Sequence, residues 1–535
     1  MAQAAFETAT ARAQSSWSPL LFEWFRWIWI ASIVSNIGTW MQNVGAAWAM
    51  ATMAPSALLV ALVQTATNLP VFLLGVPAGA VGDIVDRRKL LLFTQGWMLV
   101  AAAALGALTI AGVSGPWTLL WLTFALGLGA TMNGPAWQAI MPELVPKTEL
   151  PAAIALNSMG FNLARAVGPA LGGIVVAWIG AGAAFILNAI SFVAVLIVLY
   201  VWKRAPEHAN TSTESVVAAI GAGMRYVRFA PTMHAVLLRS GTFVLSASAL
   251  WSILPLVTKL QLHSESRGFG LLLGCLGGGS ILGALIIGRV RQLFPVEAIV
   301  SASVLAFGLV NIALAYLTSF TAVALVLLAG GMTWMAVNAN LNTAAQTSVP
   351  SWVRARAMAL YLLVFQGAMA VGSVIWGEVA SSFGLRVTLV AAGIALCVTS
   401  VATMRLRLTT SRELDVTPSL HLPEPALLVE THPDHGPVLV TVEYLIDPTR
   451  AADFAHAMDA IRRIRRRDGA VRWGLFEDAA APGRYIETFV VDSWAEHLRQ
   501  HERMTRTDRE SESKAYAYHR GSESPKVTHW IAARE

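Results

Sequence analysis

A succession of long apolar segments constrains the fold of this chain more than any other feature. An α-helix of about 20 apolar residues crosses a hydrocarbon core about 30 Å thick. Segments of this kind lie at 27–50, 56–81, 90–111, 117–140, 152–179, 182–202, 233–257, 268–288, 296–317, 320–343, 356–381 and 385–404. The sequence therefore predicts an all-α membrane fold of twelve transmembrane helices, with both ends of that fold on one side.

The basic residues indicate which side is cytoplasmic. One set of loops and segment ends holds Arg87, Arg88, Lys89, Lys147, Lys203, Arg204, Arg225, Arg228, Arg289, Arg291, Arg354, Arg356, Arg405 and Arg407. In the alternate loops the basic residues are Lys259, Arg267 and Arg386. Because Lys and Arg accumulate in cytoplasmic loops, we expect the basic loops and both termini to be cytoplasmic.

An internal repeat divides the apolar region into halves. Phe161, Ala164, Gly168, Gly173 and Gly180 recur 204 residues later as Phe365, Ala368, Gly372, Gly377 and Gly384. Two repeated halves around a central site are typical of secondary transporters. We therefore expect two pseudo-repeated six-helix lobes.

A change in composition separates a membrane region from a soluble one. Residues 1–414 carry a net charge of +10 and residues 415–535 a net charge of −4. Because the excess base lies in short loops, a nucleic-acid partner is not indicated. Residues 438–446 alternate as a strand and 450–467 have helical periodicity. With two strands, a helix opening at Ser493 and a last strand, the order β-α-β-β-α-β predicts a small α+β ferredoxin-like domain.

These patterns predict the following division of the chain. We expect a cytoplasmic tail at 1–26, lobes at 27–202 and 233–407, a cytoplasmic link at 203–232, a flexible linker at 408–436 and the ferredoxin-like domain at 437–535. The N-terminus lacks the pattern of a signal peptide. Residues 216–229 would suit a helix in the membrane interface, or equally a solvated helix.

The loop after the second apolar segment resembles a motif of the major facilitator superfamily. Gly79, Asp83, Arg87 and Arg88 fall on the positions of that motif, and Asp86 replaces its usual glycine. The resemblance implies a conformational latch, in which a carboxylate and arginines join helix ends and separate as the lobes move.

A second resemblance lies in the fifth segment. Gly168, Pro169, Gly172 and Gly173 look like the motif of antiporters in that superfamily. Small residues also allow helices to pack closely in any membrane protein. If the resemblance holds, the chain is an exporter and not an uptake protein.

The run 133–173 resembles the bacterial transmembrane secretion effector family, which includes enterobactin-type siderophore exporters and relatives of macrolide pumps. The C-terminal region is similar to antibiotic-biosynthesis-monooxygenase domains, which pair as dimers. This resemblance implies multidrug or siderophore efflux, a bacterial inner-membrane location, and a homodimer through the C-terminal domain.

Polar residues within the apolar segments are candidates for a substrate cavity. A buried guanidinium in a membrane costs about 2.5–3.5 kcal/mol, which makes Arg165 a candidate by itself. The predicted cavity set is Asn36, Gln42, Asn162, Arg165, Arg239 and Gln366. The wider group of polar and aromatic candidates also includes Asn43, Gln64, Asn68, Asn133, Gln138, Asn157, Asn338, Asn340, Asn342, Glu378, Trp40, Trp137, Phe161, Trp251, Trp334 and Phe365. For any single Asn, bonding between helices is the more common role. Because Arg165 and Arg239 are cations, we hypothesise a positive cavity suited to an anionic substrate.

Proton antiport is implied by the resemblance. The acidic candidates for proton coupling are Asp83 and Glu378. No nucleotide loop, metal-ligand pattern or catalytic arrangement is evident, and we expect neither a cofactor nor a metal. A second reading is a membrane-tethered enzyme or sensor that uses Trp473, His497 or His501 of the C-terminal domain.

Overall fold

The computed structural model describes residues 16–54, 56–202, 216–408, 415–419, 421, 432 and 435–532. The chain forms two compact units. The first consists of Met1–Thr211, Arg239–Asn340 and Leu362–Arg405, and the second of Ser212–Leu238, Leu341–Tyr361 and Leu406–Glu535.

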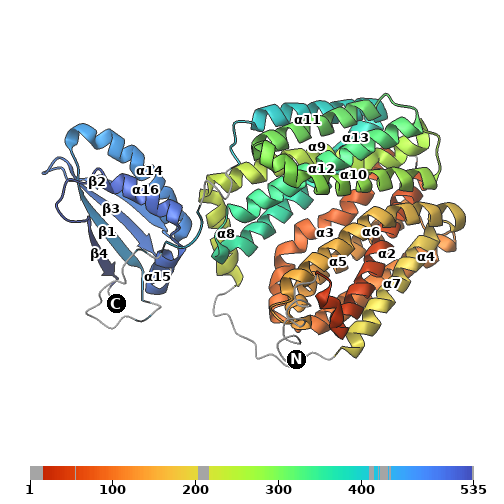
Figure 1. Cartoon of the computed structure of the whole chain (residues 1–535), viewed down its shortest axis with the longest axis horizontal. Helices are drawn as coiled ribbons and strands as arrows, with labels where there is room; N and C mark the ends of the chain where they lie inside the picture. The colour runs from red at the N-terminus through yellow and green to blue at the C-terminus, as the bar shows by residue number, and fades with distance from the viewer. Residues whose placement is uncertain are drawn as a thin grey trace, which may run out of the picture. The chain divides into compact units, whose positions relative to one another are not determined.

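The first unit holds most of the long apolar helices (Figure 1), while the first residues of α9 and α13 and the last residues of α12 belong to the second unit. The first lobe follows a short 3-10 turn, η1 (Ser18–Leu21), and contains α2 (Glu23–Met53), α3 (Ala57–Ile84), α4 (Arg87–Ile110), α5 (Pro116–Leu144), α6 (Leu150–Ile179) and α7 (Ala181–Val201). The second lobe contains α9 (Pro231–Leu256), which continues as η2 (Val257–Gln261), then α10 (Ser266–Leu293), α11 (Val296–Leu314), α12 (Phe320–Thr347) and α13 (Ser351–Thr403).

Nine helices of the described residues are long and apolar enough to cross a membrane. One of them, α13, contains Gly384 at φ 84°, a left-handed conformation that favours glycine and divides the helix where the last two predicted segments meet. The predicted segments 27–50 and 117–140 correspond to α2 and α5, which are helical but are not among those nine.

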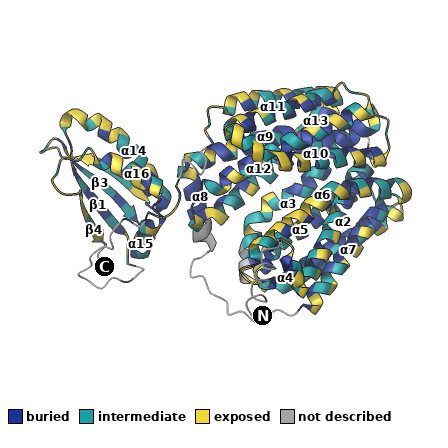
Figure 2. Ribbon diagram, viewed as in Figure 1, coloured by how far each residue is buried: buried dark blue, intermediate teal, exposed yellow. Residues whose placement is uncertain are grey.

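Helices within the first lobe pack through small residues. A Cβ atom on Gly106 of α4 would lie 2.6 Å from Ile186 Cδ1 of α7. A Cβ atom on Gly127 of α5 would lie 2.7 Å from Pro70 Cγ of α3. Such close approach is how helices associate where lipid removes the hydrophobic driving force. Figure 2 shows the buried residues along the helix sides that face other helices.

The two lobes contact each other in the halves of their helices that lie away from the basic loops. Gly173 of α6 packs against Gly270 of α10, and a Cβ atom added to Gly270 would lie 2.7 Å from Gly173 Cα. Near the start of α3, the Leu58 N–H donates to Ser381 Oγ at 2.9 Å. Lys259 Nζ donates to the Ala51 carbonyl at 2.7 Å. These three contacts join the ends that carry the sparsely charged loops, and other interlobe contacts, such as Thr65 Oγ1 donating to the Ala370 carbonyl at 3.0 Å, lie toward the middle of the helices.

The C-terminal part of the second unit, residues 435–532, has the predicted order of strands and helices, with the second helix divided in two. Its elements are β1 (Val438–Leu445), η3 (Pro448–Arg450), α14 (Ala451–Asp468), β2 (Arg472–Glu477), β3 (Arg484–Val491), α15 (Trp494–Arg503), α16 (Arg506–Tyr516) and β4 (Lys526–Ile531). The antiparallel sheet has the order β2-β3-β1-β4. Thr505 is the N-cap of α16 and forms a capping box with Asp508, so that a new helix begins after it.

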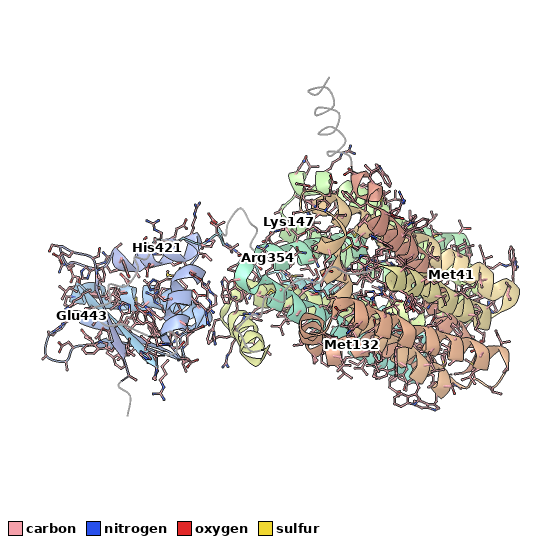
Figure 3. The ribbon with its side chains drawn as sticks, turned by 90° about the horizontal axis from the view of Figure 1, so that it is seen from below. Met41, Met132, Lys147, Arg354, His421 and Glu443 are labelled. Carbon is pink, nitrogen blue, oxygen red and sulfur yellow. The ribbon has the colours of Figure 1, made fainter. Side chains whose placement is uncertain are left out.

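The core of the C-terminal part lies between the sheet and its helices. Val440 and Tyr444 of β1 are buried against Phe454 and Met458 of α14. Part of the predicted flexible linker is also held here. His421, labelled in Figure 3, lies with Nε2 2.8 Å from Glu512 Oε2. The remainder of residues 408–436 is mostly outside the described residues.

The predicted link helix is present as α8 (Val216–Phe229). It belongs to the second unit and contacts the C-terminal part. Arg225 Nη2 lies 3.3 Å from Glu496 Oε1, and the Arg467 Cζ lies 5.5 Å from the Tyr226 ring centroid. The helix is therefore packed against protein, a role that neither sequence alternative included.

Candidate substrate-binding site

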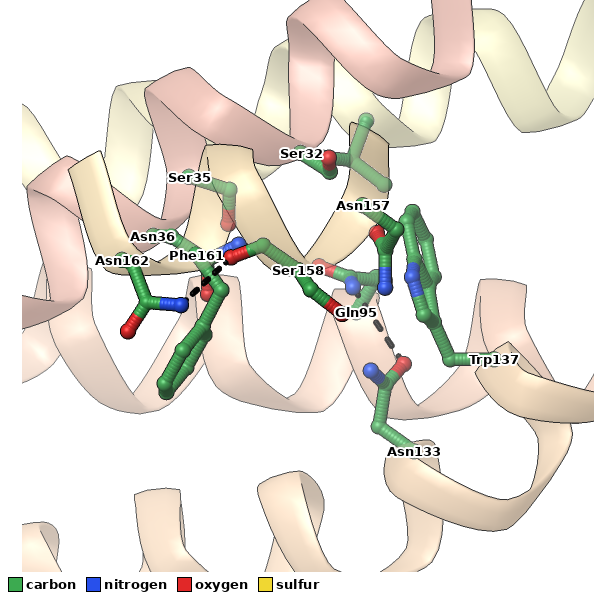
Figure 4. A pocket seen from close by; sticks show the side chains of 11 residues that line it. Ser32, Ser35, Asn36, Gln95, Asn133, Trp137, Asn157, Ser158, Phe161 and Asn162 are labelled. Carbon is green, nitrogen blue, oxygen red and sulfur yellow. Dashed lines mark hydrogen bonds between the residues drawn. The ribbon is translucent and has the colours of Figure 1, made fainter. Parts of the chain in front are cut away.

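A polar pocket of about 350 Å³ lies within the first lobe (Figure 4). Its lining comes from five helices, α2, α4, α5, α6 and α7. The lining residues are Ser32, Ser35, Asn36, Gln95, Asn133, Trp137, Asn157, Ser158, Phe161, Asn162 and Val195. These residues lie in the helix halves nearer the basic loops, away from the interlobe contacts.

Asn133 is the centre of the hydrogen bonding at the pocket. Its Oδ1 accepts from Thr94 Oγ1 at 3.1 Å and from Gln95 Nε2 at 3.2 Å. Gln95 is buried, and its Oε1 has no hydrogen-bond partner among the described residues. A buried acceptor without a partner is costly. The pocket is therefore bordered by an amide whose oxygen is buried and unpaired among the described residues.

The remaining lining combines amides with ring faces. Asn162 Nδ2 donates to the Ser158 carbonyl one turn earlier at 2.9 Å, which leaves its Oδ1 for other partners. Phe161 is 47% exposed although it lies on a membrane helix. Trp137 of α5 borders the pocket from another helix (Figure 4). The arrangement can hold a molecule by hydrogen bonds and by contact with aromatic rings.

The structure brings together only part of the predicted cavity set. Asn36 and Asn162 line the pocket. Gln42 is buried and accepts a hydrogen bond from Asn188 of α7. Arg239 is buried in the second lobe, where Nε and Nη2 donate to the Thr403 carbonyl at 3.0 and 2.8 Å. Gln366 is half-buried on α13 and is not part of the pocket lining.

Arg165 also lies outside the pocket lining. Its Cζ is 5.9 Å from the Trp40 ring centroid, within the range of a cation–π interaction. Its backbone carbonyl would lie 3.3 Å from a Cβ atom on Gly277 of α10. Arg165 is thus near the inner end of the interlobe contact, where its charge is held by an aromatic ring.

Comparison with known proteins decides the family. The sequence matches the transmembrane secretion effector family over residues 14–535. The chain belongs to this family.

Its curated relatives are transporters. The Staphyloferrin A transporter of Staphylococcus aureus is 24% identical over 382 residues, which cover 70% of this chain and 94% of the relative. The multidrug efflux pump Tap of Mycobacterium tuberculosis is 24% identical over 413 residues, covering 74% and 96%. The family and these relatives are transporters and not enzymes, so the second reading as an enzyme is set aside.

Solved structures show the same fold at low identity. An inward-facing bacterial homologue of the human lysosomal transporter Spinster has a TM-score of 0.58 at 14% identity, covering 73% of this chain and 98% of the other. The nucleoside transporter NupG has a TM-score of 0.54 at 13% identity, covering 72% and 99%. The transmembrane secretion effector chain therefore has the fold of these membrane transporters.

Two members of the predicted latch contact their own lobe in this structure. Arg87 Nη1 lies 2.7 Å from Glu143 Oε1 of α5. Arg88 donates to the Leu199 carbonyl at 2.8 Å and to the Tyr200 carbonyl at 2.7 Å. A Cβ atom on Gly79 would meet nothing within 4 Å, and the Asp83 side chain lies outside the described residues.

The glycines of the antiporter-type motif are positions of close helix approach. A Cβ atom on Gly168 would lie 2.6 Å from Trp40 Cβ, and one on Gly172 would lie 2.8 Å from Met41 Cα. Pro169 is buried, and its carbonyl would lie 2.6 Å from a Cβ on Gly270. Among the coupling candidates, Glu378 is exposed and accepts from Ser382 Oγ at 3.2 Å.

Sequence reasoning missed four polar lining residues. They are Ser32, Ser35, Gln95 and Ser158. Serines in membrane helices are common and carry no distinctive pattern. Gln95 is a single amide on an otherwise apolar face of α4, and this isolation was the available signal.

Three histidines of the C-terminal domain lie close together. The ring centroids of His497 and His501 are 4.7 Å apart, as are those of His497 and His529. The described residues contain no group of three or more ligands arranged to hold a metal ion. Trp473 donates from Nε1 to Glu487 Oε1 at 3.0 Å, as part of the domain's core.

Proposed function

We propose that this protein is a secondary active exporter that moves a small amphipathic compound out of the cytoplasm by alternating access. The observation that carries the proposal is the asymmetry of the membrane lobes. Gly173 and Gly270 join the lobes in one half of their helices, whereas the polar pocket lies in the other half. Alternating access requires that the lobes be closed in one half of their helices while the binding site lies in the other half.

The proposed topology has twelve spans in the bacterial inner membrane with both termini cytoplasmic. The positive-inside pattern supports this orientation, and the division of α13 at Gly384 into two helical segments supports the number of spans. In this orientation the pocket lies toward the cytoplasm, as in an exporter ready to load.

Export and its energy source rest on the relatives and on sequence resemblance. One relative is a staphyloferrin A transporter and another is a multidrug efflux pump, so a siderophore or a drug is the proposed cargo. Proton antiport is proposed with Asp83 and Glu378 as the coupling candidates. The latch of Gly79, Asp83, Arg87 and Arg88 is proposed to form when the cytoplasmic ends close.

The test is efflux from cells that express the protein. Cells are loaded with a siderophore or a macrolide, with and without a protonophore, beside cells that express an Asn162→Ala variant. Efflux that requires both the proton gradient and the Asn162 side chain supports the proposal. Efflux that persists with the protonophore contradicts proton antiport, and equal retention by wild-type and empty cells for both compounds contradicts export of these classes.

We also propose that the C-terminal domain is ferredoxin-like and pairs two copies of the chain. The strand order supports the fold. Leu445, Phe476 and Trp530 share one sheet face by register and are 50%, 57% and 59% exposed. An exposed apolar face of this kind marks an interaction site. A Phe476→Lys/Trp530→Lys variant should be monomeric in detergent by mass photometry, whereas an equally monomeric wild type would contradict pairing.

A further inference from the structure

The lining of the first-lobe pocket indicates the chemical class of the cargo. We infer that the pocket binds an uncharged compound in which an aromatic ring is joined to several hydroxyl or amide groups. This inference rests on the proposed export function, because it concerns the same site. It replaces the anionic substrate that the positions of Arg165 and Arg239 in the sequence suggested.

The described lining of the pocket carries no charge. The described lining consists of serine, asparagine, glutamine, aromatic and valine side chains, with no charged group among them. Arg165 lies against the Trp40 ring, and Arg239 donates to the Thr403 carbonyl in the other lobe. An ion that leaves water must find a compensating charge or bear the cost of its desolvation. The pocket supplies no such charge, so it favours a neutral molecule.

The lining also carries hydrogen-bonding groups. Amides and hydroxyls provide donors and acceptors together, which matches a cargo rich in the same groups. Gln95 Nε2 donates to Asn133 Oδ1, which fixes the amide so that Oε1 is the atom without a described partner. That oxygen is itself buried, whereas Asn162 in the lining is exposed and its Oδ1 is not used by the Nδ2 bond to the Ser158 carbonyl. A hydroxyl or amide N–H of the cargo can donate to Asn162 Oδ1, and a purely apolar drug cannot.

The lining also includes two aromatic rings. Trp137 of α5 and Phe161 of α6 border the pocket from different helices (Figure 4). Ring faces stack on a flat aromatic group. A volume of about 350 Å³ is in the range of sites for small molecules. A single aromatic unit that carries one polar ring therefore fits better than a long lipid chain.

The experiment uses two fluorescent probes that differ in one group. Methylumbelliferyl β-glucoside is neutral, and methylumbelliferyl β-glucuronide replaces its CH₂OH with a carboxylate. Binding to the purified full-length protein in detergent is measured by equilibrium dialysis. We expect the glucoside to bind at least tenfold more tightly than the glucuronide. The Asn133→Leu variant should lose at least tenfold in glucoside affinity.

The matched control is Asn311→Leu. Asn311 is a fully buried asparagine of α11 that donates to the Phe307 carbonyl and is not in the pocket. This variant should bind the glucoside as the wild type does. Equal or tighter binding of the glucuronide overturns the inference, as does no measurable glucoside binding. The inference is also overturned if Asn311→Leu lowers the glucoside affinity as much as Asn133→Leu does.

A transport measurement separates this inference from the proposed function. The same glucoside is loaded into cells and its efflux is followed. Selective binding without efflux retains the neutral substrate class and overturns export of this compound. Efflux of the glucuronide at the rate of the glucoside retains export and overturns the substrate class.

Discussion

The pocket of the first lobe and the core of the C-terminal domain bury polar groups in opposite ways. The pocket uses neutral amides, and leaves Gln95 Oε1 without a described partner. The domain core buries charges and pairs them, with Arg465 3.2 Å from Glu487 and 3.0 Å from Glu512. A buried charge is tolerated when its partner is built in. Burying an unpaired neutral group costs less free energy than burying an unpaired charge. The difference separates a structural network from a binding site.

The largest effect should come from breaking the charged network. Arg465→Leu leaves Glu487 and Glu512 buried without their cation, and we expect a loss of about 3–5 kcal/mol in the stability of the C-terminal domain. The stability of that domain is measured by denaturant unfolding, with hydrogen exchange of the domain as the readout. The matched control, Arg462→Leu, removes an exposed arginine of the same helix that pairs with Asp459. A similar loss in both variants would show that the buried pairing is not special.

A smaller effect is expected from the neutral network. Asn133→Leu removes the acceptor for Thr94 and Gln95, and such an unpaired group costs about 1–3 kcal/mol. Thermal unfolding in detergent should therefore shift less than for Arg465→Leu, while substrate binding falls sharply. If Asn133→Leu destabilised the protein more than Arg465→Leu did, the contrast between the two regions would be wrong.

The close contact between the lobes at Gly173 and Gly270, called the seam here, should be disrupted by one added methyl group. A Cβ on Gly270 would lie 2.6 Å from the Pro169 carbonyl oxygen, whereas one on Gly278 of the same helix would meet nothing within 4 Å. We expect Gly270→Ala to lower efflux about tenfold, equivalent to about 1.4 kcal/mol, because the closed seam cannot form. Gly278→Ala serves as the control and should transport normally. Equal rates for the two variants would contradict the seam.

A further effect is a pH dependence of the C-terminal domain. Burial, aided by His501 and His529, lowers the pKa of His497 from 6.5 to about 3. The unfolded chain therefore binds more protons between those values, and stability falls as the pH falls through that range. Burial raises the pKa of Asp468 to about 6, so this group acts in the opposite sense between its ordinary pKa of 3.8 and that value.

Replacement isolates the histidine contribution. His497→Phe should flatten the loss of stability between about pH 6.5 and 4 by up to about 1.4 kcal/mol per pH unit. His456→Phe, at an exposed position of α14, is the control. Unfolding curves at several pH values measure the slope. An unchanged slope in His497→Phe would show that this imidazole is not held neutral by the fold.

The sequence predicted the elements better than it predicted the site. Segment length and strand alternation placed the helices and the order of strands, because both patterns are local. The cavity set was only partly assembled, since Asn36 and Asn162 face the pocket while Gln42 bonds to Asn188. A helix has several faces, and which one borders a cavity depends on neighbours that are distant in sequence. Arg239 illustrates this, because its partner carbonyl is 164 residues away.

The most direct test of alternating access is a pair of distances between the lobes. With Cys275 and Cys397 replaced by serine, spin labels at Lys147 and Arg289 report the basic-loop ends, and labels at Val113 and Tyr316 report the opposite ends; all four labelled positions are exposed. Adding the methylumbelliferyl glucoside and a proton gradient in proteoliposomes should shorten the first distance and lengthen the second. Two distances that stay constant, or that change in the same direction, would contradict the account.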